Sequence, residues 1–245
     1  MTKNFKREIS QYSNKDLEQR KNWYSHVAEA YNQARPHYPQ KIIRRAVELA
    51  KLTPTANILE VGCGPGTATV GFAELGFSMV CLEPSQASSQ LARENCTQYD
   101  NVEVQNTSFE EWQLEASKFH AVLAATSFHW IPGDVAYAKA ARALKSDGYL
   151  ILLWNMLLEP QYEVYQELEP VYQAHAPFLA RYEGREKQLE NLGSFAEIVM
   201  KSGQFRDLVS EHMPCEVTYS TNKYLTLLNT YSQCTFNVNS VLKPL

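Results

Sequence analysis

A glycine-rich stretch that follows an apolar run is the first feature of this chain that could carry chemistry. The apolar residues 57–61 (NILEV) lead into the sequence EVGCGPGT at 60–67. Glycines in a turn between a strand and a helix let the backbone bend sharply, and they let a ligand lie close without Cβ atoms in the way. The stretch therefore predicts a loop that holds a small ligand, although a purely structural turn would use the same residues.

The spacing of these glycines narrows the class of ligand. A dinucleotide-binding loop has glycines at its first, third and sixth positions. Here Gly62, Gly64 and Gly66 occupy the first, third and fifth positions, and Pro65 removes a backbone N–H that could hold a phosphate. No Gly-Lys-Ser/Thr follows, so the loop is not of the Walker type. The pattern favours a nucleoside ligand without a pyrophosphate.

Glu83 adds a second polar group to this candidate site. It directly follows the apolar residues 78–82 (SMVCL), which are typical of a second strand. A carboxylate at the end of that strand can accept hydrogen bonds from both hydroxyls of a ribose. A solvated carboxylate at a strand end is the alternative. The acid and the glycine loop together predict a nucleoside site.

The elements that must position these residues alternate along the chain. Helical patterns at 67–75, 86–95 and 134–144 separate short apolar runs. This alternation predicts an α/β fold with a Rossmann-like, mainly parallel sheet and helices on both faces. The five runs that we expect to form strands are 57–61, 78–82, 102–105, 121–125 and 149–154.

The whole chain, 1–245, is expected to form one domain. A helix over 42–52 leads into the sheet, helices over 162–173 and 185–201 follow it, and a further strand at 217–219 precedes a helix from Tyr224. We divide the domain into an N-terminal arm and helix (1–40), a cofactor-binding core (41–156), a helical cap (157–212), and a C-terminal strand and helix (213–245).

Composition excludes several classes of function. The net charge of −4 gives no electrostatic basis for binding nucleic acid or an anionic membrane. No apolar run is long enough to span a bilayer, and the N-terminus is too polar for a secretory signal. The histidines lack metal-ligand spacing, so no metal is expected. The five cysteines form no CxxC pair, which is typical of reduced thiols in a cytoplasmic protein: Cys63, Cys81, Cys96, Cys215 and Cys234.

Taken together, the loop and the acid resemble the cofactor site of class I S-adenosylmethionine-dependent methyltransferases. Two further stretches, 31–39 (YNQARPHYP) and 125–130 (ATSFHW), are similar to the small-molecule branch that includes trans-aconitate methyltransferase-like proteins. The likeness covers roughly residues 24–155. It implies S-adenosylmethionine as cofactor and a small molecule as methyl acceptor, in a monomer or a homodimer.

The resemblance also implies roles for single residues around the cofactor. Gly62, Gly64 and Gly66 would let the backbone approach the methionine and ribose portions, and Glu83 would bind the ribose. Glu60 would support the amino end of the cofactor. Arg35 would bind a carboxylate, either the cofactor's or an acidic substrate's, because its planar fork suits a carboxylate; the alternative is a surface arginine.

For the adenine, the family usually places an acidic residue after the third strand, and this chain has Ser108 there, followed by Phe109. Ser108 would form a weaker hydrogen bond, and Phe109 would pack on the ring.

Four aromatic or imidazole side chains complete the predicted site. Tyr31, Tyr38 and Trp130 would close walls over the substrate, although ordinary helix packing explains the tyrosines equally well. His129 would act as a base or orient the substrate; the alternative is a histidine packed beside Trp130 that shapes the pocket.

The C-terminal part departs from the family pattern. The family closes its sheet with an antiparallel pair of strands, and only the first of them, at 217–219, can be placed here, so we expect a six-stranded sheet. A protein that kept the fold and binds a cofactor or partner without turnover is one alternative function. A nicotinamide-dependent oxidoreductase is another, which the glycine spacing and Pro65 disfavour.

Overall fold

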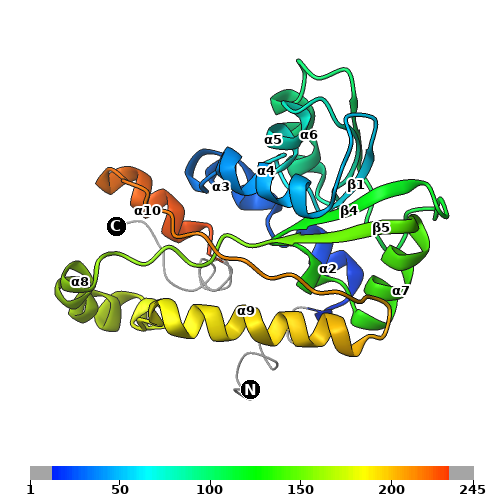
Figure 1. Cartoon of the computed structure of the whole chain (residues 1–245). Coiled ribbons are helices and arrows are strands. Elements are labelled where there is room, and N and C mark those ends of the chain that lie inside the picture. Colours follow the sequence, from blue (N-terminus) through cyan, green and yellow to red (C-terminus); the bar gives the residue numbers. More distant parts are fainter. Residues whose placement is uncertain (1–12, 232–245) are drawn as a thin grey trace.

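The computed structural model describes residues 13–231, and a five-stranded parallel sheet lies at its centre (Figure 1). The strand order is β3-β2-β1-β4-β5, and each neighbouring pair is parallel. The predicted α/β fold is therefore confirmed. The strands are β1 (Asn57–Val61), β2 (Ser78–Leu82), β3 (Val102–Gln105), β4 (Phe119–Ala125) and β5 (Leu144–Leu153).

Both faces of the sheet are covered, because successive side chains of a strand point to opposite faces. In β1, Ile58 packs into the apolar core under α4 (Gln40–Leu49), α5 (Thr69–Ala73) and α6 (Gln86–Asn95). Leu59 packs on the other face, in the core that includes Ala136 and Ala140 of α7 (Gly133–Ala143). The apolar character of the strands thus follows from burial on both sides.

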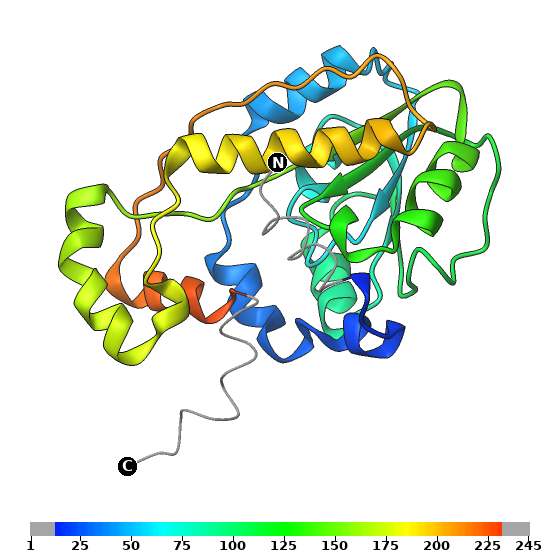
Figure 2. The same ribbon diagram turned by 90° about the horizontal axis from the view of Figure 1, so that it is seen from below.

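Helices before and after the sheet extend the molecule beyond it. The chain enters through α2 (Leu17–Asn22), the 3-10 helix η1 (Ser25–Val27) and α3 (Ala28–Ala34). After the sheet, α8 (Tyr162–His175), the 3-10 helix η3 (Pro177–Leu179) and α9 (Gly184–Lys201) form the helical part predicted as a cap. Figures 1 and 2 show α9 running along the molecule on the side of the sheet away from α4 and α5.

The last described helix, α10 (Thr221–Asn229), returns to the N-terminal helices. Leu227 and Tyr231 form a small apolar cluster with Ala34 of α3. The Tyr219 hydroxyl donates to the Ala34 carbonyl oxygen at 2.7 Å. Residues almost two hundred positions apart in the sequence are therefore in contact at α3, shortly before the chain enters the sheet.

The prediction of a strand at 217–219 was wrong, and so was the prediction of a six-stranded sheet. Residues 204–220 contain no helix or strand. Arg45 of α4 holds this segment by two hydrogen bonds to Glu211, from Nε at 2.9 Å and from Nη2 at 2.7 Å. This segment is therefore held to α4 by a side-chain ion pair and does not join the sheet. The end of the predicted C-terminal strand and helix, residues 232–245, lies outside the described residues.

No helix in the described part is long and apolar enough to cross a membrane.

Candidate functional site

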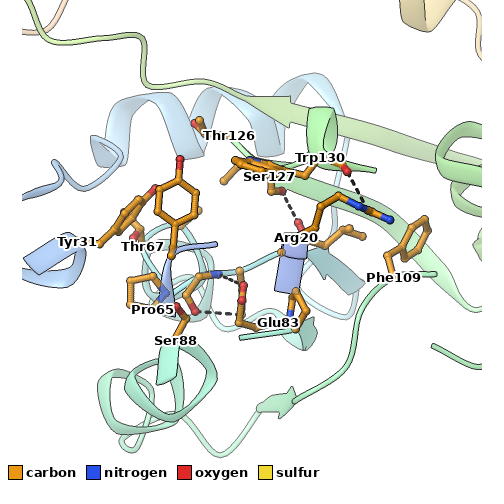
Figure 3. A pocket seen from close by; sticks show the side chains of 18 of the residues that line it. Arg20, Tyr31, Pro65, Thr67, Glu83, Ser88, Phe109, Thr126, Ser127 and Trp130 are labelled. Carbon is orange, nitrogen blue, oxygen red and sulfur yellow. Dashed lines mark hydrogen bonds between the residues drawn. The ribbon is translucent and has the colours of Figure 1, made fainter. Parts of the chain in front are cut away.

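A pocket opens where the parallel strands end and the N-terminal helices cross them (Figure 3). Ligands of open α/β sheets bind at this edge, outside the carboxyl ends of the strands. The loops after β1, β2, β4 and β5 contribute Gly62, Glu83, Thr126 and Asn155. The opposite wall comes from the N-terminal segment, which contributes Leu17, Arg20, Tyr24, Tyr31, Arg35 and Tyr38.

The glycine loop after β1 is fixed by main-chain hydrogen bonds. The N–H groups of Gly62 and Cys63 both donate to the Leu82 carbonyl oxygen, at 2.8 Å and 3.0 Å. Gly62 has φ +68°, and a Cβ added there would lie 2.8 Å from the Cβ of Ser127. Gly64 has φ +57°, and a Cβ there would meet nothing within 4 Å. Gly62 is thus required by both conformation and space, whereas Gly64 is required by conformation alone.

Glu83 lines the pocket and is held by the backbone on both sides. Its Oε2 accepts from the Gly64 N–H and its Oε1 from the Ser85 N–H, each at 2.8 Å (Figure 3). The side chain is 7% exposed, and burial raises its pKa to about 7 although the two backbone donors act in the opposite direction. Each oxygen keeps a lone pair for a further donor. The carboxylate is therefore preoriented to accept two hydroxyl groups.

Glu60, two residues before the glycine loop, does not line the pocket. Its side chain lies on the α5 face of the sheet, where Oε2 accepts from the Thr69 hydroxyl at 2.6 Å and from the Cys81 thiol at 3.8 Å. It is completely buried, and burial raises its pKa to about 7. This placement connects Glu60 to the first turn of α5. It does not bring the carboxyl group to the pocket.

Arg35 lines the pocket and is held by the C-terminal helix region. Its Nε donates to Thr230 Oγ1 at 2.8 Å and its Nη2 to the Thr230 carbonyl oxygen at 2.9 Å. The guanidinium carbon lies 5.0 Å from the ring centre of Tyr31 and 4.7 Å from that of Tyr231. The cation is thus enclosed between aromatic rings and has no carboxylate partner among the described residues.

Ser108 and Phe109 line the other end of the pocket, after β3. The Ser108 hydroxyl donates to Glu111 Oε2 at 2.9 Å and accepts from the Glu111 N–H at 3.2 Å, so it holds a turn of its own loop. Phe109 is 3% exposed and stacks on Trp112 with the ring centres 6.1 Å apart. The apolar ring offers a surface for a flat ligand group.

His129 lies outside the pocket although its neighbour Trp130 lines it. The half-buried imidazole packs among Trp130, Trp154 and Phe195, with ring centres 5.6, 6.0 and 6.1 Å away. Burial lowers its pKa to about 4, so the ring is neutral at physiological pH. This geometry corresponds to the alternative of a histidine that packs beside Trp130 and shapes the pocket. Tyr31 and Tyr38 reach the pocket as predicted residues of its wall.

Arg20 of α2 is a pocket residue that sequence reasoning missed. Its Nη1 forms an ion pair with Glu110 and donates to the Trp130 carbonyl oxygen at 2.9 Å (Figure 3). Beside it, Lys21 pairs with Glu111 at 2.8 Å. The sequence around Arg20 carries no motif, and only the fold brings it to a loop ninety positions away.

A protein-family model described as "Methyltransferase domain" matches residues 58–148, which span β1 to the middle of β5. An uncharacterized methyltransferase of Mycobacterium tuberculosis is 31% identical over 126 residues, which are 51% of this chain and 49% of that protein. Residues 58–148 of the chain therefore form a class I methyltransferase domain. The glycine loop and Glu83 both lie within this matched region.

Other relatives are more distant. A protein-L-isoaspartate O-methyltransferase of Aliivibrio fischeri is 30% identical over 113 residues, 45% of this chain and 52% of that one. The chain thus spans about half the length of these curated relatives.

Solved structures agree with the fold of this methyltransferase. A methyltransferase of Methanococcus maripaludis aligns over 83% of this chain and 87% of its own, with TM-score 0.50 and 18% identity. An N-methyltransferase of Haemonchus contortus, in complex with phosphomonomethylethanolamine and S-adenosylhomocysteine, aligns over 76% of this chain and 43% of its own, with TM-score 0.51 and 18% identity. At this identity they support the arrangement of the sheet and helices alone.

The cofactor of this family is S-adenosylmethionine, and the pocket residues fit it. The backbone-held carboxylate of Glu83 suits the two ribose hydroxyls, and the space beside Gly64 leaves room for close approach of a ligand. No group of three or more His, Cys, Asp or Glu side chains within 13–231 is arranged to hold a metal ion.

Proposed function

We propose that this chain transfers a methyl group from S-adenosylmethionine to a small molecule bound between the strand ends and the N-terminal helices. The observation that carries the proposal is the Glu83 carboxylate, which faces the pocket beside the glycine loop and is oriented by the Gly64 and Ser85 N–H groups. A carboxylate fixed in this way accepts vicinal hydroxyls of a ribose without losing side-chain entropy on binding.

Other pocket residues support binding of the remaining parts of the cofactor. Phe109 offers an apolar face for the adenine, with Ser108 close by. Arg35, a cation without a carboxylate partner in the described chain, is suited to the carboxylate of the methionine portion. Gly62 lets the chain pass against Ser127 so that the loop leaves the pocket open. Glu60 contributes indirectly, through Thr69 at the start of α5.

The reaction requires alignment more than acid–base chemistry. When bound, the cofactor supplies an electrophilic methyl group on a sulfonium. The chain has to hold the acceptor in line with that group and exclude water.

Apart from Glu83, which we assign to the ribose, the described pocket residues contain no histidine and no carboxylate without a cationic partner. Burial raises the pKa of Tyr38 far above neutral, Glu110 is paired with Arg20, and His129 lies outside the pocket. We infer that the acceptor presents a lone pair that needs no deprotonation by these residues.

A small acceptor agrees with the charge and enclosure of the site. The chain carries a net charge of −4, which disfavours nucleic acid. The pocket is bounded by Tyr24, Tyr31 and Trp130, whose rings form a compact aromatic wall. The four described cysteines are free thiols, which supports a reducing compartment such as the cytoplasm.

Calorimetric titration with S-adenosylhomocysteine and with NAD tests the cofactor. We expect S-adenosylhomocysteine to bind and NAD not to bind, and Glu83→Ala to weaken S-adenosylhomocysteine at least roughly tenfold because two charge-assisted hydrogen bonds are lost. Glu103→Ala, which removes an exposed carboxylate on β3, is the matched control and should leave the affinity unchanged. An unchanged affinity of Glu83→Ala would overturn the assignment of the site.

Turnover is tested separately. Transfer of a labelled methyl group to any member of a metabolite panel supports the enzyme. Binding of S-adenosylhomocysteine without transfer to any compound would favour the alternative of a protein that binds the cofactor without turnover.

A further inference from the structure

A chain of three hydrogen-bonded groups lies on the pocket wall at the ends of β4 and β5. The hydroxyls of Tyr38 and Thr126 are 2.7 Å apart, and the Asn155 N–H donates to Thr126 Oγ1 at 3.2 Å. The Asn155 side chain is itself held, because its Nδ2 donates to the Pro36 carbonyl oxygen at 3.0 Å. All three residues line the pocket.

Within this hydrogen-bonded group, one hydroxyl hydrogen has no acceptor. Thr126 Oγ1 accepts from Asn155, and the contact between the two hydroxyls uses one of their two hydrogens. If Tyr38 donates, the Thr126 hydrogen remains; if Thr126 donates, the Tyr38 hydrogen remains. In the part of the chain that the structure describes, no acceptor is placed for it. Because burial raises the pKa of Tyr38, its hydroxyl stays protonated.

The backbone of Thr126 supports a functional role for this position. Thr126 has φ +55°, a conformation that branched side chains rarely adopt. Strain of this kind is typical of binding and catalytic positions, where the surrounding structure holds it in place. Here the Thr126 N–H donates to the Leu153 carbonyl oxygen at 2.8 Å, which ties the residue to the end of β5.

The position in the sheet separates this group from the predicted cofactor residues. Glu83 follows β2, and in the strand order β4 and β5 lie on the other side of β1. Figure 3 likewise shows Thr126 across the pocket from Glu83. A nucleoside held over β1 and β2 therefore leaves the β4–β5 side of the pocket for the second ligand.

We propose that Tyr38 and Thr126 form the acceptor subsite of the proposed methyltransferase, where they donate one hydrogen bond to a carbonyl-type oxygen of the methyl acceptor. Asn155 is a positioning residue that orients the Thr126 hydroxyl. The inference rests on the proposed function. Carboxylates and amides both present such an oxygen, so both belong to the class of ligand that we expect at this subsite.

Binding of three one-ring probes to the protein saturated with S-adenosylhomocysteine tests the subsite. We use benzoate, benzamide and benzylammonium, because the wall around Tyr31 and Trp130 is aromatic. Benzoate or benzamide should bind the wild type, and the double variant Tyr38→Phe/Thr126→Val, which removes both hydroxyl hydrogens, should weaken that binding roughly tenfold through loss of one hydrogen bond. Thr126→Ser, which keeps a hydroxyl, should retain most of it. Benzylammonium, which has no oxygen, should be insensitive to all three substitutions.

Thr126→Gly separates this role from a structural one. Glycine relieves the strained backbone, so in the Tyr38→Phe background, where no other hydroxyl of the pair remains, Thr126→Gly should keep or raise the Tm while the probe affinity falls. Ser117→Gly is the matched control, because Ser117 has φ +53° and does not line the pocket. It should raise the Tm without changing probe affinity.

The remaining outcomes all count against the subsite. If the substitutions at Tyr38 and Thr126 weaken binding of S-adenosylhomocysteine and leave the probe affinity unchanged, the two hydroxyls bind the cofactor and not the acceptor. Unchanged affinity for both, or no binding of either oxygen-bearing probe to the wild type, would also overturn the inference. Failure of S-adenosylhomocysteine to bind the wild type would overturn the proposed function itself, and the inference with it.

Discussion

The pocket has two walls that are held together in different ways. The wall at the strand ends, residues 62–67, 83–85 and 126–127, is held by the main chain: four of its N–H groups fix the glycine loop and Glu83, with donor–acceptor distances of 2.8–3.0 Å. The wall from residues 17–38 is held by side chains, through Arg20 with Glu110 and Arg35 with Thr230. Main-chain hydrogen bonds define one geometry, whereas side-chain pairs between separate elements can separate and pair again. The first wall therefore presents a preformed binding surface, whereas the second can adjust when ligands enter and leave.

The largest expected effect comes from breaking the strand-end wall at Gly62. Gly62→Ala forces a side chain into a left-handed conformation and places its Cβ against Ser127, so we expect S-adenosylhomocysteine binding to be lost. Calorimetry measures the loss. Gly76→Ala is the matched control, because Gly76 has φ +86° with nothing within 4 Å and lies outside the pocket. It should lower the Tm and leave the affinity intact; equal affinity losses in both variants would contradict a specific role of Gly62.

A second, smaller effect concerns how the stability of the protein depends on pH through Glu83 of the strand-end wall and through Glu60, which is buried outside the pocket. Burial raises the pKa of Glu60 and Glu83 to about 7, above the value of an unfolded carboxyl group. The folded state therefore binds protons more tightly, so their contribution to stability is complete below about pH 4.5 and is lost as the pH rises to about 7. We expect the free energy of unfolding of the apo-protein to fall by about 1–3 kcal/mol per group over this range.

Glu60→Gln, which resembles the protonated side chain, should remove one part of this pH dependence. Urea unfolding at about pH 5 and about pH 8 measures it in both proteins. Glu115→Gln, a substitution at a surface carboxyl group, is the control and should keep the slope of the wild type. If Glu60→Gln has the wild-type slope, Glu60 is ionised in the folded protein across the whole range and the argument from burial fails.

The difference between the two walls also decides what could be predicted from the sequence. The fold and the glycine loop could be predicted because their determinants are local: apolar runs, helical spacing, and the glycine and acid positions around β1 and β2. The orientation of Glu60 followed from the alternation of β1, since Ile58 and Glu60 share a face away from Leu59. That alternation was the available signal, and the resemblance to the family directed attention to the cofactor instead.

The helical wall could not be predicted to the same extent. Arg20 reaches Glu110 and Arg35 reaches Thr230 only after α2, α3 and α10 have packed, and no local pattern encodes such distant pairs. The strand at 217–219 failed for a related reason. Its short apolar pattern is compatible with a strand, but no neighbouring strand pairs with it in the described structure.

The smallest expected effect tests the helical wall at Arg20. The Arg20 and Glu110 side chains are 10% and 17% exposed, so the pair is partly shielded from solvent. Arg20→Ala should weaken S-adenosylhomocysteine only about twofold to fivefold, because it loosens α2 over the pocket without changing the strand-end wall. The wild type should also lose affinity between about 0.05 M and about 0.5 M salt, and Arg20→Ala should be less sensitive. Lys201→Ala, which breaks an exposed pair on α9, is the control and should match the wild type at both salt concentrations. A loss as large as that of Gly62→Ala would mean that Arg20 contacts the cofactor directly, and the two walls would then share one binding role.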